Sequence, residues 1–196
     1  MSLKNKTIKG VAWNIVGNIA RQILMVLTLI VMARFLTPED FGVYAILMLF
    51  VTFMNIFSSM GTSQAVIHID NPSQQMLSSI FYFNIATGIL LFIILFFLAW
   101  PISEFFDNPD LVHLLQVIGL IFIITTFSLV QKTLLEKSML FKRVVTLETI
   151  ALTSSSLAGM TLAVLGVGIY SLVIMALLNA TILSIGLWLN SHWRPS

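Results

Sequence analysis

Long apolar runs separated by short polar breaks dominate the 196-residue chain. A helix crosses the hydrocarbon core of a bilayer with about 20 mostly apolar residues, at a rise of about 1.5 Å per residue. Six stretches of this chain meet that length. The pattern therefore predicts an all-α membrane protein with six transmembrane helices. The predicted spans are Val11–Phe35, Phe41–Ile67, Ser78–Trp100, Leu111–Val130, Val145–Leu165 and Ile169–Leu189.

The breaks between the runs carry residues that start or stop helices. Thr37-Pro38-Glu39-Asp40 places a hydroxyl at the N-cap, proline at the first helical position and two acids in the first turn. Two Asn-Pro pairs repeat this arrangement before the third and fourth spans. Glycines predict a tight turn between the last two spans and leave no room for a separate domain, so residues 1–196 are expected to form a single helical lobe. These other breaks are Asn71-Pro72, Asn108-Pro109 and Gly166-Val167-Gly168.

The N-terminus also resembles a secretory signal peptide, because lysines precede Ile23–Ala33, an apolar stretch of suitable length. Asn14, Asn18 and Arg21 interrupt that pattern, and no small-residue cleavage site follows them. We therefore expect a retained first helix rather than a cleaved leader.

Composition agrees with a lipid environment and narrows the chemistry. The chain is 58% hydrophobic and 9% charged, whereas a soluble domain is about half apolar and about a quarter charged. Cysteine is absent, which removes disulfides, thiolate nucleophiles and Cys-ligated metals. The three histidines are scattered, and the chain carries no catalytic or metal-binding motif. We expect neither an enzyme nor a bound metal or cofactor.

The few charged residues predict the orientation of the helices. If both termini lie in the cytoplasm, Arg34 is the one basic residue in the segments on the outer side, which otherwise carry acidic residues. Segments facing the cytoplasm of a membrane protein carry an excess of Lys and Arg. The sequence thus predicts a multi-pass inner-membrane protein with both termini in the cytoplasm. The basic residues assigned to the inside are Lys4, Lys6, Lys9, Lys132, Lys137, Lys142, Arg143 and Arg194.

Polar residues within the spans are the candidate binding groups. Asn14, Asn18 and Arg21 recur at helical spacing and therefore share one face of the first span, while Asn55 lies on a polar face of the second. Small polar residues also hold transmembrane helices together, so packing is the alternative role for the asparagines.

Arg21 needs a separate explanation. It lies about ten residues, or roughly 15 Å, into the first span. An arginine at the centre of a membrane costs about 2.5–3.5 kcal/mol on insertion scales. One interpretation is that Arg21 faces a polar cavity and binds an anion, because the guanidinium fork matches phosphate oxygens. The other is that it reaches the cytoplasmic headgroups or pairs with Glu148, near the inner end of the fifth span.

Ala33–Gly42, which reads ARFLTPEDFG, is similar to the signature that joins the first two helices of polysaccharide-transport flippases. These proteins belong to the multidrug/oligosaccharidyl-lipid/polysaccharide (MOP) exporter superfamily. Further segments resemble the family in the same order along nearly the whole chain, including Phe105–Pro109 and Trp193–Pro195. The signature residues are Arg34, Thr37, Pro38, Glu39, Asp40, Phe41 and Gly42.

The resemblance implies export of a lipid-linked oligosaccharide, such as an undecaprenyl-diphosphate repeat unit of O-antigen or capsule, from the inner to the outer leaflet. Family members have two helical lobes around a central cavity and alternate their access between membrane faces. This chain then corresponds to the N-terminal lobe alone, and a C-terminal lobe or a second copy would complete it. The expected partners are the lipid-linked substrate and membrane lipids, with no nucleic acid. Arg21, Asn14, Asn18 and Asn55 would line the cavity.

Three other functions stay open at this point. One is a multidrug exporter of the same superfamily, against which the Thr37–Gly42 motif argues. Another is a membrane-bound polysaccharide polymerase or ligase, although the predicted outer loops are short and carry acidic residues rather than a catalytic domain. The last is a non-transporting scaffold or the remnant of a truncated gene.

Overall fold

The computed structural model of the chain describes residues 3–58 and 72–196, with side chains described for residues 17–57 and 72–196. Helices account for nearly all of this part, and no strand occurs within it. The elements are α1 (Leu3–Met32), α2 (Pro38–Ser58), α4 (Gln74–Phe105), α5 (Asp110–Ile118), α6 (Leu120–Thr126), α7 (Leu129–Lys137), α8 (Phe141–Val164) and α9 (Tyr170–Asn190).

Four of the described helices are long and apolar enough to cross a membrane, namely α2, α4, α8 and α9. The pair of segments Asp110–Thr126 and Leu129–Lys137 passes the same test together but bends by 42°, which gives up to five spans. The described apolar part of α1, Gly17–Met32, is shorter. The expected class, an all-helical multi-pass membrane protein, is confirmed, whereas the number six and the orientation stay predictions.

The predicted spans match the helices except in two places. The second was expected to reach Ile67, but α2 is described only to Ser58, and residues 59–67 lie outside the described part. The fourth was expected as one helix over Leu111–Val130. It is instead divided into α5, α6 and the start of α7. The first division falls at Gly119, and the second falls at Phe127 and Ser128, where the Ser128 N–H donates to the carbonyl three residues earlier, that of Thr125, instead of four.

The turns follow the expected local chemistry with one correction. Thr37 and Asp40 cap α2 reciprocally: the Thr37 N–H and hydroxyl donate to the Asp40 carboxylate at 2.8 and 2.9 Å, and the Asp40 N–H donates to the Thr37 hydroxyl at 3.2 Å. The Asn108 side chain accepts from the Asp110 N–H at the start of α5, at 3.1 Å. Helix α4, however, is capped by Ser73, whose hydroxyl accepts from the Met76 N–H, and Asn71, the expected cap, lies outside the described residues.

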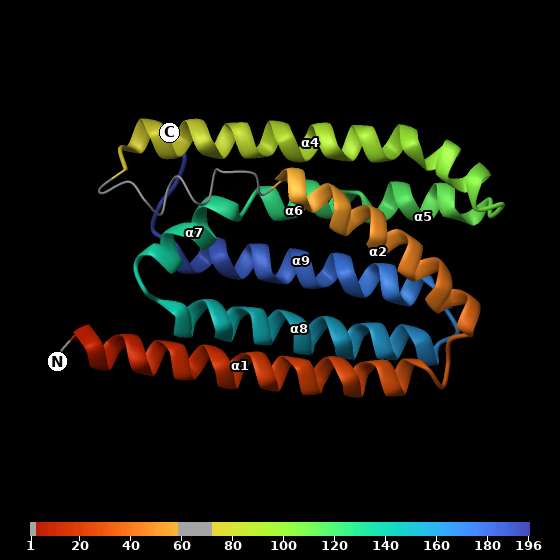
Figure 1. Cartoon of the computed structure of the whole chain (residues 1–196), viewed down its shortest axis with the longest axis horizontal. Helices are drawn as coiled ribbons and strands as arrows, with labels where there is room; N and C mark the ends of the chain where they lie inside the picture. The colour runs from red at the N-terminus through yellow and green to blue at the C-terminus, as the bar shows by residue number, and fades with distance from the viewer. Residues whose placement is uncertain (1–2, 59–71) are drawn as a thin grey trace.

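The helices form a layered array in which α1, α8 and α9 lie side by side and α4 occupies the opposite edge (Figure 1). Helix α2 crosses over α5 and α6. The main apolar core of the protein lies between α2, α4, α5, α6 and α9. Helix α1 packs mainly against α8. Large apolar side chains cover the outside of α1, α2 and α4, which suits contact with lipid tails; they include Ile23, Leu27, Phe53, Phe83, Leu90 and Phe97.

Candidate functional site

The close approach of α1 to α8 positions the charged residues of the candidate site. Gly17 lies directly against the side chain of Val145, so any larger residue would collide with that valine. Small residues allow transmembrane helices to come this close. One helical turn further along both helices, the same approach brings Arg21 opposite Glu148.

The bend between α6 and α7 brings a second cation to the same place. Where the helix is interrupted, the carbonyl of Phe127 accepts a hydrogen bond from the Trp188 indole at 2.9 Å. The two rings also stack, with centroids 4.9 Å apart. Helix α7 then runs against α8, and Lys132 Nζ lies 2.8 Å from Glu148 Oε1.

Glu148 therefore bridges two cations from two different helices. Arg21 Nη1 contacts Glu148 Oε2, Lys132 contacts Oε1, and Arg21 Nη2 also donates to Asn18 Oδ1. The side chains are 19% exposed for Arg21, 21% for Glu148 and 33% for Lys132. We call Asn18, Arg21, Lys132 and Glu148 the charge cluster. With two positive groups and one negative group, the cluster keeps one unit of positive charge.

Pairing with Glu148 is the alternative that the sequence leaves open for Arg21, and it is the arrangement in the structure. A paired guanidinium still has further N–H donors, so the cluster has the chemistry to bind an additional anion. A role for Arg21 in substrate binding stays a prediction.

The other predicted cavity residues are only partly brought together. Asn18 belongs to the charge cluster, whereas the side chain of Asn14 lies outside the described residues. Asn55 is exposed on α2, which diverges from α1 beyond their short connection and packs on α4, α5 and α6 (Figure 1). Helical spacing identified the shared face of α1, but it carries no information on how α1 and α2 are placed relative to each other.

Lys132 is the cluster member that the sequence analysis assigned to a cytoplasmic segment. Its position two residues beyond the predicted end of an apolar span is typical of a residue at the membrane surface. The bend after α6 and the burial of Val130, Gln131 and Thr133 show instead that α7 packs into the helix array. The sequence did not indicate this packing, because the burial of Gln131, directly before Lys132, is seen only in the structure.

The signature motif forms the connection between α1 and α2 rather than part of the charge cluster. Thr37 and Asp40 make the reciprocal cap, and Phe41 packs against the apolar group that contains Met32 and Leu36. Arg34 is exposed, as are Pro38 and Glu39, and the space around Gly42 is open. This segment thus fixes how α2 leaves α1.

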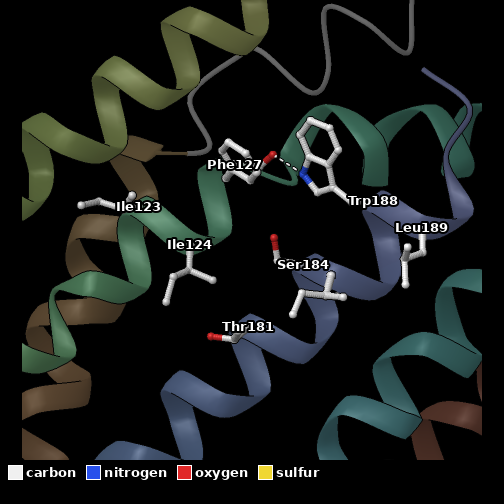
Figure 2. A pocket seen from close by; sticks show the side chains of 8 residues that line it. Ile123, Ile124, Phe127, Thr181, Ser184, Trp188 and Leu189 are labelled. Atoms are coloured by element: carbon white, nitrogen blue, oxygen red, sulfur yellow. Dashed lines mark hydrogen bonds between the residues drawn. The ribbon is translucent and has the colours of Figure 1, made fainter. Parts of the chain in front are cut away.

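A second feature is an apolar groove between α6 and α9, with a volume of about 360 Å³ (Figure 2). The stacked Phe127 and Trp188 close one end of it, and the hydroxyl groups of Thr181 and Ser184 are its main polar groups. Such a surface can accept a hydrocarbon chain, but it offers no charge to a sugar or phosphate. Its other lining residues are Ile123, Ile124, Ile185 and Leu189.

Comparison with known proteins gives a family and several partial relatives. A family model described as “Polysaccharide biosynthesis protein” matches residues 31–196. An “Uncharacterized membrane protein in cps region” of Klebsiella pneumoniae is 33% identical over 124 residues, which cover 63% of this chain and 26% of that protein. The “Lipopolysaccharide biosynthesis protein WzxC” of Escherichia coli is 26% identical over 124 residues, covering 63% of this chain and 25% of that protein.

The “Succinoglycan biosynthesis transport protein ExoT” of Rhizobium meliloti is 26% identical over 113 residues, covering 58% of this chain and 23% of that protein. The matched part of the chain thus spans about a quarter of the length of these curated relatives. No solved structure matches the chain.

Proposed function

We propose a function from the premise that this chain belongs to the polysaccharide biosynthesis protein family: it supplies one lobe of a flippase for lipid-linked oligosaccharides. The flippase would move undecaprenyl-diphosphate-linked units from the inner to the outer leaflet of the bacterial cytoplasmic membrane by alternating access. Two of the relatives support this proposal by their names, which refer to lipopolysaccharide biosynthesis and to succinoglycan transport. A transport role also favours a protein without catalytic activity of its own.

The physical problem of such transport is the headgroup. A sugar-diphosphate cannot cross hydrocarbon unaided, because its charges and hydroxyl groups would lose their hydration without new partners. A polar groove that is open to lipid on one side allows the head to cross while the tail remains in the bilayer.

The single observation that carries the proposal is the charge cluster, which holds excess positive charge beside α1, a helix with many exposed apolar side chains. Arg21 is well suited to phosphate, since its planar fork can donate two parallel hydrogen bonds to one group. We propose Arg21 and Asn18 as contacts of the substrate head, with Asn14 and Asn55 lining other parts of the assembled cavity. The completed cavity would need a C-terminal lobe or a second copy of this chain.

The proposal is tested by measuring surface glycan in a strain that lacks its own flippase. Residues 1–196 are expressed together with a matching C-terminal half, and glycan export is expected to return. The same pair carrying Arg21→Ala should insert in the membrane but leave the glycan inside. Export that is unaffected by Arg21→Ala would contradict the role of the cluster, and no export from any pairing would contradict the flippase.

A further inference from the structure

Glu148 occupies both cations of the charge cluster at once, with one carboxylate oxygen for each. Oε2 faces Arg21 on α1, and Oε1 faces Lys132 on α7 at 2.8 Å. A side chain of α8 thus lies between two positive groups that belong to two other helices. None of the three side chains is more than one-third exposed, so water can only partly screen them.

A carboxylate in this position uses the same donors that a phosphate group would use. Both anions present oxygen acceptors to guanidinium and ammonium groups through short, charge-assisted hydrogen bonds. A diphosphate group carries more negative charge than a carboxylate and offers more oxygens. It can therefore satisfy two cations on separate helices better than a single glutamate, provided that the glutamate moves away.

The charge balance points the same way. With Glu148 in place, the cluster has one positive charge in excess. Without it, two cations face each other in a partly buried site, which is costly unless another anion takes the place between them. An arriving phosphate and the Glu148 carboxylate thus compete for the same pair of donors.

We propose that Glu148 is a built-in competitor of the phosphate group, held between Arg21 and Lys132 when the site is empty and displaced when the headgroup binds. Lys132 is then the second phosphate-binding cation, and Glu148 limits the affinity so that the headgroup can leave again. This inference rests on the proposed function and identifies how that site recognises and releases a diphosphate.

Binding measured on the purified full chain in lipid nanodiscs tests the proposal. The probes are inorganic pyrophosphate, titrated from solution, and undecaprenyl diphosphate, incorporated in the nanodisc, which separate a free phosphate from a lipid headgroup. Glu148→Gln keeps the size of the side chain but removes its charge. We expect the dissociation constant for one or both probes to fall about tenfold, which corresponds to about 1.4 kcal/mol. Lys132→Ala should raise it by a similar factor.

Glu136→Gln is the matched control, because it removes a carboxylate from α7 outside the cluster and should leave both dissociation constants unchanged. If Glu148→Gln does not give folded protein, Glu148→Asp serves instead. Its shorter side chain cannot reach both cations, so tighter binding is again expected. Unchanged or weaker binding in the folded variant, or failure of both variants to fold, would overturn the competitor role.

The outcome is separable from that of the proposed function. Glycan export that survives in cells, combined with no tightening in Glu148→Gln, would refute the competitor while leaving the flippase intact. Tighter pyrophosphate binding in Glu148→Gln, combined with no export from any pairing of lobes, would keep the anion site and refute the flippase.

Discussion

Removing different members of the charge cluster should have different consequences, because Arg21 and Lys132 each contact Glu148. Without Arg21, Glu148 still faces Lys132 and the pair stays neutral. Without Glu148, two cations are left without their shared partner. The cluster is therefore expected to tolerate loss of the arginine in folding terms, and the effect of that loss should appear in function.

The first prediction concerns Arg21 in a complete, two-lobed protein. Arg21→Ala is expected to leave membrane insertion intact or improved, because it removes the cost of an arginine within the membrane, and to abolish export. Arg21→Lys should restore part of the activity, since an ammonium group cannot donate the paired hydrogen bonds of a guanidinium. Surface glycan and the amount of membrane-inserted protein are measured together. Full export from Arg21→Ala would assign Arg21 a purely structural role.

The second prediction concerns the contact that places the cluster. Gly17→Leu forces α1 away from Val145 and should separate Arg21 from Glu148, with a loss of stability of about 1–3 kcal/mol as in other overpacked contacts. Gly42→Leu is the control, since nothing lies within reach of a side chain there. The measurement is the thermal unfolding midpoint in detergent. Equal midpoints for the two variants would show that α1 and α8 can separate freely.

At the scale of elements, apolar length predicted most helices because a membrane leaves the backbone no alternative to internal hydrogen bonding. The division of the fourth predicted span was missed because apolar length alone does not show where a helix is interrupted. Leu111–Val130 is apolar enough on average to be taken as one span, and the polar residues near the interruption, such as Thr126 and Ser128, also occur within continuous transmembrane helices. At the interruption, the Phe127 carbonyl accepts a hydrogen bond from a tertiary partner, the Trp188 indole, which lies 61 positions further along the chain.

Tertiary packing also limited the prediction of the candidate site. The cost of a membrane arginine was sufficient to single out Arg21, and periodicity correctly added Asn18 to its face. Lys132 could not be identified in this way, because it joins the cluster through the direction of α7 after the bend. Residues on one helix are predictable from spacing, whereas residues brought together by packing are not.

The third prediction concerns the interruption between α6 and α7 at Phe127 and Ser128. Trp188→Phe keeps an aromatic ring beside Phe127 but removes the donor to its carbonyl. The free energy of unfolding is expected to fall by about 1 kcal/mol, which lowers the unfolding midpoint by about 2–4 °C. Trp100→Phe is the matched control, because that ring is 52% exposed on α4. A midpoint for Trp188→Phe equal to that of the control would show that the hydrogen bond does not stabilise the bend.

The fourth prediction concerns the orientation of the elements. Because the chain lacks cysteine, single cysteines at Asp107 and Lys137 are clean reporters. A membrane-impermeant thiol reagent applied to intact cells should label the first position and spare the second, and permeabilised cells should show both. Labelling of Lys137→Cys alone would reverse the orientation, and labelling of both in intact cells would require a different number of spans between them.

At the scale of the whole molecule, the helices of the array contribute unequally to the buried apolar core. Helices α4, α5, α6 and α9 enclose most of the buried apolar core with α2, while α1 is attached at one edge, mainly through α8. The described side chains of the helix that carries Arg21 thus lie outside the main apolar core. This arrangement leaves α1 available to a further lobe without rearrangement of the core.

The fifth prediction concerns the chain by itself. Residues 1–196 should insert and fold, because each helix satisfies its own backbone hydrogen bonds. They should not restore surface glycan to a flippase-deficient strain, because alternating access requires two lobes that move against each other. Co-expression of a matching C-terminal half should recover some export. Restored glycan from residues 1–196 alone would mean that two copies of this chain form the working transporter.

The contact between α1 and α8 can form only after both helices have been synthesised. Arg21 and Glu148 are 127 positions apart, so the ribosome completes the arginine helix long before its acidic partner exists. At about 5–20 residues per second, the interval is about 6–25 s. During that time α1 must wait with its arginine supported by nearer groups such as Asn18, by water or by headgroups. Slow codons between the two helices would lengthen this wait, so the rate of synthesis sets how long the arginine stays without its acidic partner.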